Sequence, residues 1–184
     1  MGPIDELLCL GDCIFEYRFS NEVIALLRDR GAHVIKGNHE DVFFGSLGER
    51  ARNQPWIDPE LLRWLDERPS EIALERAGKK LLLVHSTPWS PRGTYVCPGS
   101  PLLRRFGEVD ADYVFYGHTH MQLAERHAGT LVINPGSAGD ARDSRRSNLL
   151  SCAVLDPQAD AVEFFDFPDV AMQEALAAAF AQPA

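Results

Sequence analysis

The 184-residue chain is 45% hydrophobic, which is enough apolar material for one domain with a sizeable core and little for two. Its formal net charge of −9, with no run of Lys or Arg, argues against sequence-independent binding to nucleic acid, so no binding to a nucleic-acid duplex is expected. No leader-like N-terminus and no apolar stretch of membrane-spanning length is present. We therefore expect a cytoplasmic protein without a membrane partner, folded as a single domain over residues 1–184.

Strand and helix patterns alternate in the first part of the chain. They are predicted in the order strand 7–12, helix 20–31, strand 32–40 and helix 58–69. Ser20 or Asn21 is the expected cap of the first helix and Gly31 its stop, whereas Asp58 caps the second helix. The second strand is expected to end in a Gly-Asn turn.

The remainder of the chain is mostly strand. Residues 71–86 predict a hairpin whose turn is Ala77-Gly78. The further predicted elements are a Pro- and Gly-rich loop at 87–101, a short helix at 102–109, strands at 111–120, 129–137, 149–156 and 161–167, and a terminal helix at 169–181. This order indicates an α/β layered fold with a mixed sheet or a pair of sheets. In such folds ligands gather at the carboxyl ends of the strands.

Four apolar runs end at residues that can bind a metal ion. The runs are "LCLGD", "HVIKGNH", "LLLVH" and "YVFYGHTH", and the candidate residues are Asp12, Asn38, His39, His85, His118 and His120. Carboxylate, amide and imidazole ligands without thiolate suit a hydrolytic site for Mn, Fe or Zn better than a structural zinc site. His118 and His120, two residues apart, would point the same way if the strand continued to its end.

Each of these residues alone has an ordinary structural explanation. A single histidine at a strand end is more often a hydrogen-bonded residue than a ligand, and "GD" or "GN" is common in turns. The joint pattern favours a site, because four of the six histidines follow these strands, whereas His33 and His127 do not.

The same motifs carry a family resemblance. "GD" after an apolar strand, then "GNHE", "VH" and "GHTH" in this order, resembles the calcineurin-like metallophosphoesterases. "NPGS", "NEVIALLR" and "YVFYGHTH" are similar to the small bacterial phosphodiesterase branch in particular. The resemblance runs from about Ile4 to Asp156 and implies a metallophosphoesterase-type fold of mixed β-sheets flanked by helices.

The resemblance also implies roles for individual residues. Asp12 corresponds to the carboxylate that bridges two divalent cations, and His120 to a ligand of the first cation. Ligands of the second cation correspond to Asn38, His85 and His118. His39 corresponds to the catalytic histidine that assists the leaving group or the phosphate charge.

The implied function is hydrolysis of a small-molecule phosphoester, a phosphodiester in particular, by a metal-activated water. Mn is the expected cofactor, with Fe, Zn, Ni and Mg as alternatives. Arg142 is a candidate phosphate contact or a solvated loop residue. Glu40 could orient His39 or lie at the surface, and Trp89 and Tyr95 could stack on a substrate or pin their loop.

One departure from the family pattern limits this expectation. The family's Asp-x-His strand and following helix are not found, and only three residues precede Ile4, so the first βα unit is expected to be missing through a mis-assigned start or a real loss. Asp12 and His120 then remain for the first cation, and the site could hold one ion or none. The alternative function is a catalytically impaired binding or scaffold protein, and a homo-oligomer could cover the sheet edge that the missing strand exposes.

A weaker alternative keeps phosphatase chemistry with another substrate. Dinucleoside polyphosphates or phosphoproteins are compatible with "GNHE". The stretch after Asp12, "CIFEYRFSNE", lacks the Asp-Arg-Gly sequence that those branches usually carry there. That difference favours the phosphodiesterase branch.

Overall fold

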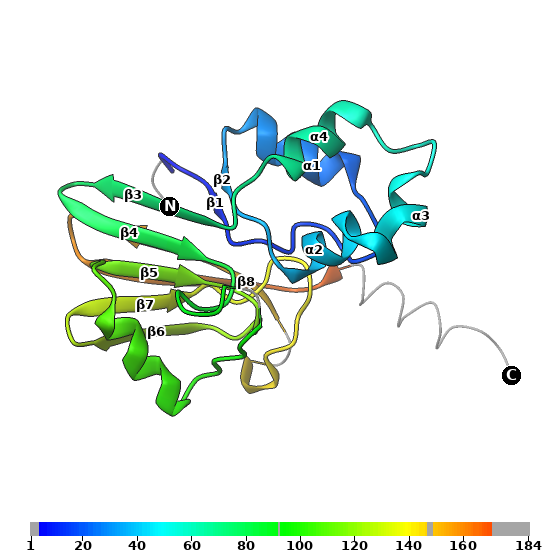
Figure 1. Ribbon diagram of the computed structural model, residues 1–184. Coiled ribbons are helices and arrows are strands. Elements are labelled where there is room, and N and C mark those ends of the chain that lie inside the picture. Colours follow the sequence, from blue (N-terminus) through cyan, green and yellow to red (C-terminus); the bar gives the residue numbers. More distant parts are fainter. Residues whose placement is uncertain (1–3, 92, 147–148, 171–184) are drawn as a thin grey trace, which may run out of the picture.

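A five-stranded mixed sheet forms the centre of the computed structural model, which describes residues 4–91, 93–146 and 149–170 (Figure 1). The strand order is β3-β4-β5-β7-β6. The strands are β3 (Glu71–Arg76), β4 (Lys79–Val84), β5 (Tyr113–Tyr116), β7 (Thr130–Asn134) and β6 (Leu123–His127). Because β4, β5 and β7 run parallel, their carboxyl ends lie along one edge of the sheet.

Tight hairpins form both edges of this sheet. Ala77 and Gly78 adopt left-handed backbone angles between β3 and β4, which confirms the predicted hairpin and its turn. Ala128 and Gly129 do the same between β6 and β7. β6 was not predicted, because its sequence "LAERH" is short and mostly polar, as suits an edge strand.

The two faces of the central sheet are both covered. Alternate residues point to opposite faces, so Leu83 and Phe115 join one buried cluster while Val84 and Val114 join another. The 3₁₀-helix η2 (Pro101–Glu108) packs on the second face through Leu103. It replaces the short helix predicted at 102–109 and begins one residue earlier, where the Ser100 side chain accepts a hydrogen bond from the Leu102 amide.

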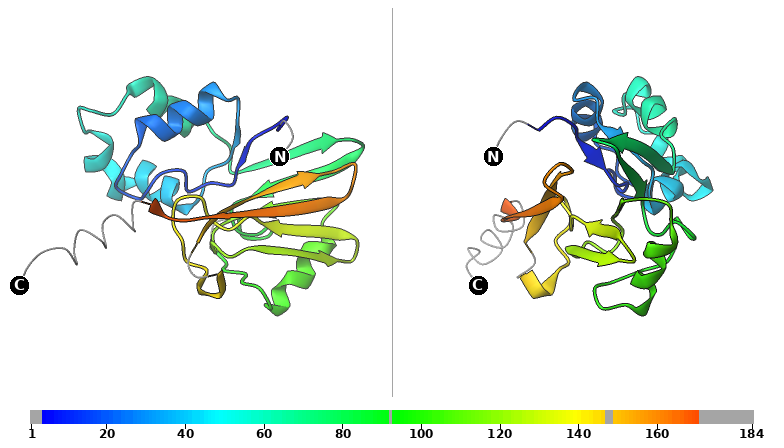
Figure 2. Two further views of the ribbon diagram at one scale, coloured as in Figure 1. Left: turned by 180° about the vertical axis from the view of Figure 1, so that it is seen from behind. Right: turned by 90° about the vertical axis from the view of Figure 1, so that its left-hand side faces the viewer.

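Two small sheets cover the other face. β1 (Leu8–Cys9) pairs in parallel with β2 (His33–Val34), and β8 (Leu150–Asp156) pairs antiparallel with β9 (Ala161–Phe167). Leu8, Leu155 and Val162 pack on the same cluster as Leu83 and Phe115. Figure 2 shows the two pairs of strands side by side against the larger sheet. The expected layered α/β fold with mixed sheets is therefore confirmed.

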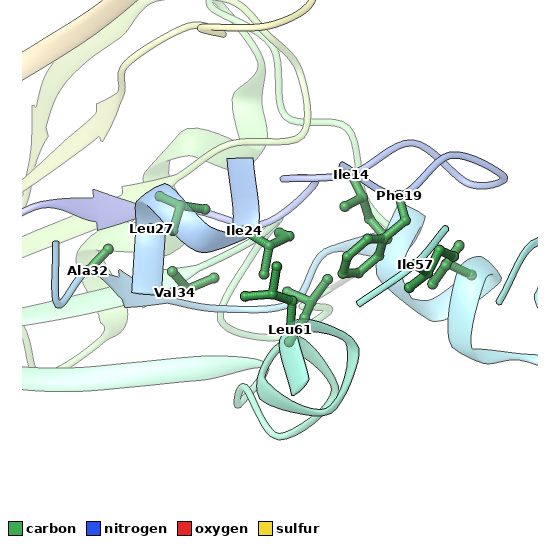
Figure 3. Close-up of a cluster of buried hydrophobic side chains, with 10 residues drawn as sticks. Ile14, Phe19, Ile24, Leu27, Ala32, Val34, Ile57 and Leu61 are labelled. Carbon is green, nitrogen blue, oxygen red and sulfur yellow. The ribbon is translucent and has the colours of Figure 1, made fainter. Parts of the chain in front are cut away.

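Helices gather beside the β1–β2 pair (Figure 1). They are α1 (Asn21–Asp29), α2 (Asn38–Phe44), α3 (Glu49–Arg52) and α4 (Pro59–Asp66), with the 3₁₀-helices η1 (Ser46–Gly48) and η3 (Ser144–Arg146) elsewhere in the loops. The buried cluster in Figure 3 joins α1, α4 and β2 through Ile24, Leu61 and Val34. Ser20 and Asp58 cap α1 and α4 as predicted, each accepting a hydrogen bond from a backbone amide of the first turn.

Two predictions about elements need correction or lie outside the described residues. The strand predicted at 32–40 shrinks to two residues, and the chain enters α2 at Asn38 instead of turning. Glu40, the third residue of α2, stabilises the beginning of that helix, because its carboxylate accepts a hydrogen bond from the amide of the capping residue Gly37, 2.7 Å away. The terminal helix predicted at 169–181 lies outside the described residues, apart from its first two. In the part of the chain that the structure describes, no helix has the length and apolar character of a membrane span.

Candidate metal centre

Four side chains meet where β1, β2, β4 and β5 end. His85, directly after β4, lies at the centre of the group. Its Nε2 atom is 3.0 Å from Asn38 Oδ1, 3.1 Å from His118 Nδ1 and 3.3 Å from Asp12 Oδ2. The sequence thus predicted correctly that these strand ends converge.

The Leu10 carbonyl sets the orientation and proton of the His85 ring. His85 Nδ1 lies 2.7 Å from Leu10 O, so it donates its proton there, and Nε2 of the neutral ring presents a lone pair to the other three side chains. Although burial disfavours the imidazolium, the hydrogen bond and charge of Asp12 outweigh it and raise the pKa of His85. Burial likewise opposes ionisation of Asp12, but His85 and the His39 amide together lower the pKa of its carboxyl.

The donor set fits a divalent cation. Ligand atoms about 2.1 Å from a first-row metal ion lie about 3.0 to 3.4 Å apart, which is the spacing that His85 Nε2 makes with its three neighbours. Burial and the neighbouring His85 lower the pKa of His118 to about 4, so His118 is neutral and able to donate a lone pair at pH 7. The Nε2 atom of His118 is buried and has no hydrogen-bond partner among the described residues. The four converging side chains thus offer ligand atoms at a spacing that suits a cation.

The backbone at this site is strained. Asp12, His118 and His120 have φ angles of 54°, 61° and 57°, in the left-handed region that side chains other than glycine seldom adopt. The strand alternation that would make His118 and His120 point the same way does not apply, because β5 ends at Tyr116. Strain of this kind, outside hairpin turns, is typical of functional sites.

Glycine at position 37 leaves room for the centre. A Cβ atom there would lie 2.7 Å from His85 Nδ1 and closer still to Asp12 Oδ1. We expect Gly37→Ala to weaken Mn²⁺ binding about tenfold or more, since it displaces two of the converging side chains. Isothermal titration would measure this, with Gly139→Ala as the control, because nothing lies within 4 Å of a Cβ atom at Gly139. Unchanged affinity in Gly37→Ala would show that the two side chains do not hold the ion.

Glu40 holds the loop that carries Asp12. Its fully buried carboxylate accepts hydrogen bonds from the amides of Asp12, Ile14 and Gly37 at 2.8, 3.2 and 2.7 Å, and from Cys13 Sγ at 3.3 Å. The interpretation of Glu40 as a surface residue is wrong, and its contacts are with backbone amides of the Asp12 loop. These amides would otherwise be buried without acceptors, which explains why the acid lies there.

His39 and His120 lie next to this group. The His39 amide donates to Asp12 Oδ1 at 2.9 Å, and its side-chain Nε2 is 4.0 Å from Asp12 Oδ2. The His120 ring is held by Asp140, whose carbonyl is 3.0 Å from Nδ1, and burial together with Arg142 lowers the pKa of His120. His120 does not belong to the tightest cluster, in which ligand atoms of Asp12, His85 and His118 lie within 4.8 Å of one another.

Two supporting residues were not assigned these roles from the sequence. Asp140 also pairs with Arg142, whose Nη2 is 2.6 Å from its carboxylate, so Arg142 lies on the His120 side of the centre. Asn134 of "NPGS" is fully buried and donates to the Gly117 carbonyl at 2.7 Å and to Thr119 Oγ1 at 3.0 Å. It thereby fixes the loop that carries both histidines. The sequence feature that could have indicated this role is the position of Asn134 at the end of β7, beside β5.

Comparison with protein families identifies the superfamily of the chain. A model of the calcineurin-like phosphoesterase superfamily domain matches residues 1–160. The chain belongs to the calcineurin-like phosphoesterase superfamily. The family suggested by "GD", "GNHE" and "GHTH" is therefore confirmed.

Individual relatives show how far the similarity extends. The uncharacterized protein MJ0912 of Methanocaldococcus jannaschii is 27% identical over 187 residues, covering 83% of this chain and 72% of that protein. The probable metallophosphoesterase YsnB of Bacillus subtilis is 30% identical over 96 residues, about half of each protein. A crystal structure of a metallophosphoesterase from Sphaerobacter thermophilus superposes with a TM-score of 0.75 at 22% identity, covering 99% of this chain and 86% of that one. This last similarity concerns the fold.

Proposed function

We propose that this calcineurin-like phosphoesterase is a metal-dependent phosphodiesterase that acts on a small-molecule phosphoester. The observation that carries the proposal is the convergence of Asp12, Asn38 and His118 on His85 Nε2, at 3.0 to 3.3 Å. A set of oxygen and imidazole ligands without thiolate, buried at the two histidines, suits hydrolytic metals, of which Mn²⁺ is the first choice.

Each residue has a defined part in the proposal. Asp12, Asn38, His85 and His118 hold one cation, and Asp12 and His120 contribute to a second. When bound, the cations supply positive charge for the phosphate and an activated water as nucleophile. That charge also accounts for an anionic substrate on a protein of net charge −9.

Two residues of the chain act directly on the substrate. His39, whose side chain is 15% exposed, stands beside Asp12 and donates a proton to the leaving group or a hydrogen bond to the phosphate. Arg142, half exposed and paired with Asp140, contacts a phosphate oxygen on the His120 side.

Hydrolysis of bis(4-nitrophenyl) phosphate tests the proposal. Protein freed of metal with EDTA should be inactive, and Mn²⁺ should restore activity. We expect His39→Ala to lower kcat about 10²-fold to 10³-fold with little change in Mn²⁺ affinity, since loss of a general acid costs that much. His127→Ala is the matched control, because His127 lies at the β6–β7 turn beside Glu125. No turnover by the wild-type protein with any of the five candidate metals would contradict the proposal.

A second candidate is a binding or scaffold protein built on the same fold. The observation that favours it is the small number of ligands for the first cation. Among the described residues, we assign only Asp12 and His120 to that cation, and His120 lies outside the cluster of Asp12, His85 and His118. This candidate expects bound metal without turnover, and a biological role that His39→Ala leaves intact. Turnover by the wild-type protein decides against it.

A further inference from the structure

Two exposed aromatic rings lie against histidines of the metal centre. The Tyr95 ring stacks on His118, with the ring centres 3.9 Å apart and the planes at 29°. The Phe15 ring lies 5.1 Å from the His39 ring, at 54°. Tyr95 is 59% exposed and Phe15 is 53% exposed, so each presents open aromatic surface beside the centre.

Tyr95 is held firmly although its ring is exposed. The preceding residue, Thr94, exchanges two hydrogen bonds with Ser86, its amide donating to Ser86 Oγ at 3.2 Å and its carbonyl accepting from the same hydroxyl. The following residue, Val96, is fully buried, and its carbonyl accepts a hydrogen bond from Tyr116 Oη at 2.8 Å. A ring fixed between two anchored residues loses little conformational entropy when a ligand packs on it.

Phe15 is held in a comparable way. Its amide and carbonyl pair with those of Arg18 at 3.2 and 3.1 Å, which closes a tight turn. The residue before it, Ile14, is buried, and its amide donates to Glu40. The turn therefore presents the Phe15 side chain at a fixed place next to His39.

Trp89, the other aromatic residue considered in the loop at 87–101, has a different role. Its ring packs on Phe106 at 5.0 Å and lies beneath the Arg105 guanidinium at 4.2 Å. Trp89 therefore pins the loop to η2 and is not part of the open aromatic surface. The loop thus uses one aromatic residue for anchoring and presents the other at the metal centre.

From Phe15 to Tyr95, a continuous chain of contacts passes through the centre. Phe15 touches His39, His39 lies beside Asp12, and Asp12 is followed by His85, His118 and Tyr95. A phosphate held among the central residues would lie between the two rings in this chain of contacts, so that each ring could receive one ester group. Flat aromatic groups stack on such rings with favourable energy.

We propose that Tyr95 and Phe15 bind the aromatic ester groups of the substrate, so that the protein prefers phosphodiesters of aryl or nucleoside alcohols over those of aliphatic alcohols. The proposal rests on the proposed function and specifies its substrate class. Tyr95 receives the group on the His118 side, and Phe15 receives the group on the His39 side.

Binding of phenylphosphonate and methylphosphonate tests this, since neither compound can be hydrolysed at its carbon–phosphorus bond. We expect the Mn²⁺-loaded protein to bind phenylphosphonate about tenfold more tightly than methylphosphonate in isothermal titrations. Because a single phenyl group can stack on either ring, the double variant Tyr95→Leu/Phe15→Leu should reduce that ratio severalfold, whereas Tyr95→Phe should keep it. Tyr17→Leu is the control, because Tyr17 is equally exposed, at 54%, and makes no ring contact with these histidines.

The outcomes separate this inference from the proposed function. Equal affinity for the two phosphonates, or binding of neither, would overturn the inference. An equal loss of affinity for both phosphonates in the double variant Tyr95→Leu/Phe15→Leu would also overturn it, because the rings would then only position the histidines. Because the readout is binding, a protein that binds phenylphosphonate selectively but hydrolyses no diester would contradict the proposed function alone.

Discussion

Asp12→Asn is expected to lower kcat/KM for bis(4-nitrophenyl) phosphate about a thousandfold, equivalent to about 4 kcal/mol of transition-state stabilisation. Asparagine matches aspartate in size and tolerates the left-handed backbone at this position, where φ is 54°, so the change removes charge with little effect on shape. His85 and the His39 amide keep the pKa of Asp12 low, and the wild-type carboxylate is therefore ionised at neutral pH. Losing that charge weakens both proposed cation sites at once.

Mn²⁺ affinity should fall in parallel with the rate, and isothermal titration would measure it. The matched control is Asp160→Asn, because Asp160 also has a left-handed backbone, with φ of 51°, but lies in the β8–β9 turn. An Asp12→Asn protein that binds Mn²⁺ as tightly as the wild type would show that Asp12 is not a ligand.

Glu40→Ala is expected to reduce the free energy of unfolding by about 3 to 5 kcal/mol. The substitution leaves the amides of Asp12, Ile14 and Gly37 buried without their acceptor. An unsatisfied buried donor costs about 1 to 3 kcal/mol, and solvent entering the space recovers part of the sum. Urea denaturation followed by circular dichroism would measure the change.

Glu60→Ala provides the comparison for Glu40→Ala. Glu60 also lies in the first turn of a helix, α4, but is exposed, so its loss should change stability by less than about 0.5 kcal/mol. Glu40→Gln keeps one acceptor oxygen and should lie between the two, which preserves the test if the alanine variant does not fold. Equal stability of the Glu40→Gln and Glu60→Ala proteins would rule out the supporting role of Glu40.

The convergence of the four candidate ligands was predictable because its signal is local. Each of Asp12, Asn38, His85 and His118 follows an apolar run, and parallel strands bring their carboxyl ends to a common edge. Ligand chemistry could then be inferred from residue type alone. The separate sheets and their order followed less directly, since strand pairing depends on contacts between distant segments.

The supporting residues were harder to predict because their roles depend on tertiary contacts. A glutamate at position 40 is an ordinary surface residue by composition, and only the three amides around it explain its burial. Stacking of Tyr95 on His118 likewise depends on how Ser86 and Tyr116 hold the loop on either side. No local pattern encodes such contacts.

The left-handed backbone at Asp12, His118 and His120 implies that the side chains of the metal centre are kept at a cost in stability. Glycine would adopt these φ angles without strain, and each such replacement would relieve about 1 kcal/mol while deleting a side chain of the centre. Engineering that screens only for a higher melting temperature has no reason to retain the side chains at these three positions and can discard the centre. A screen that also selects for bound metal would keep the strain as a necessary cost of the site.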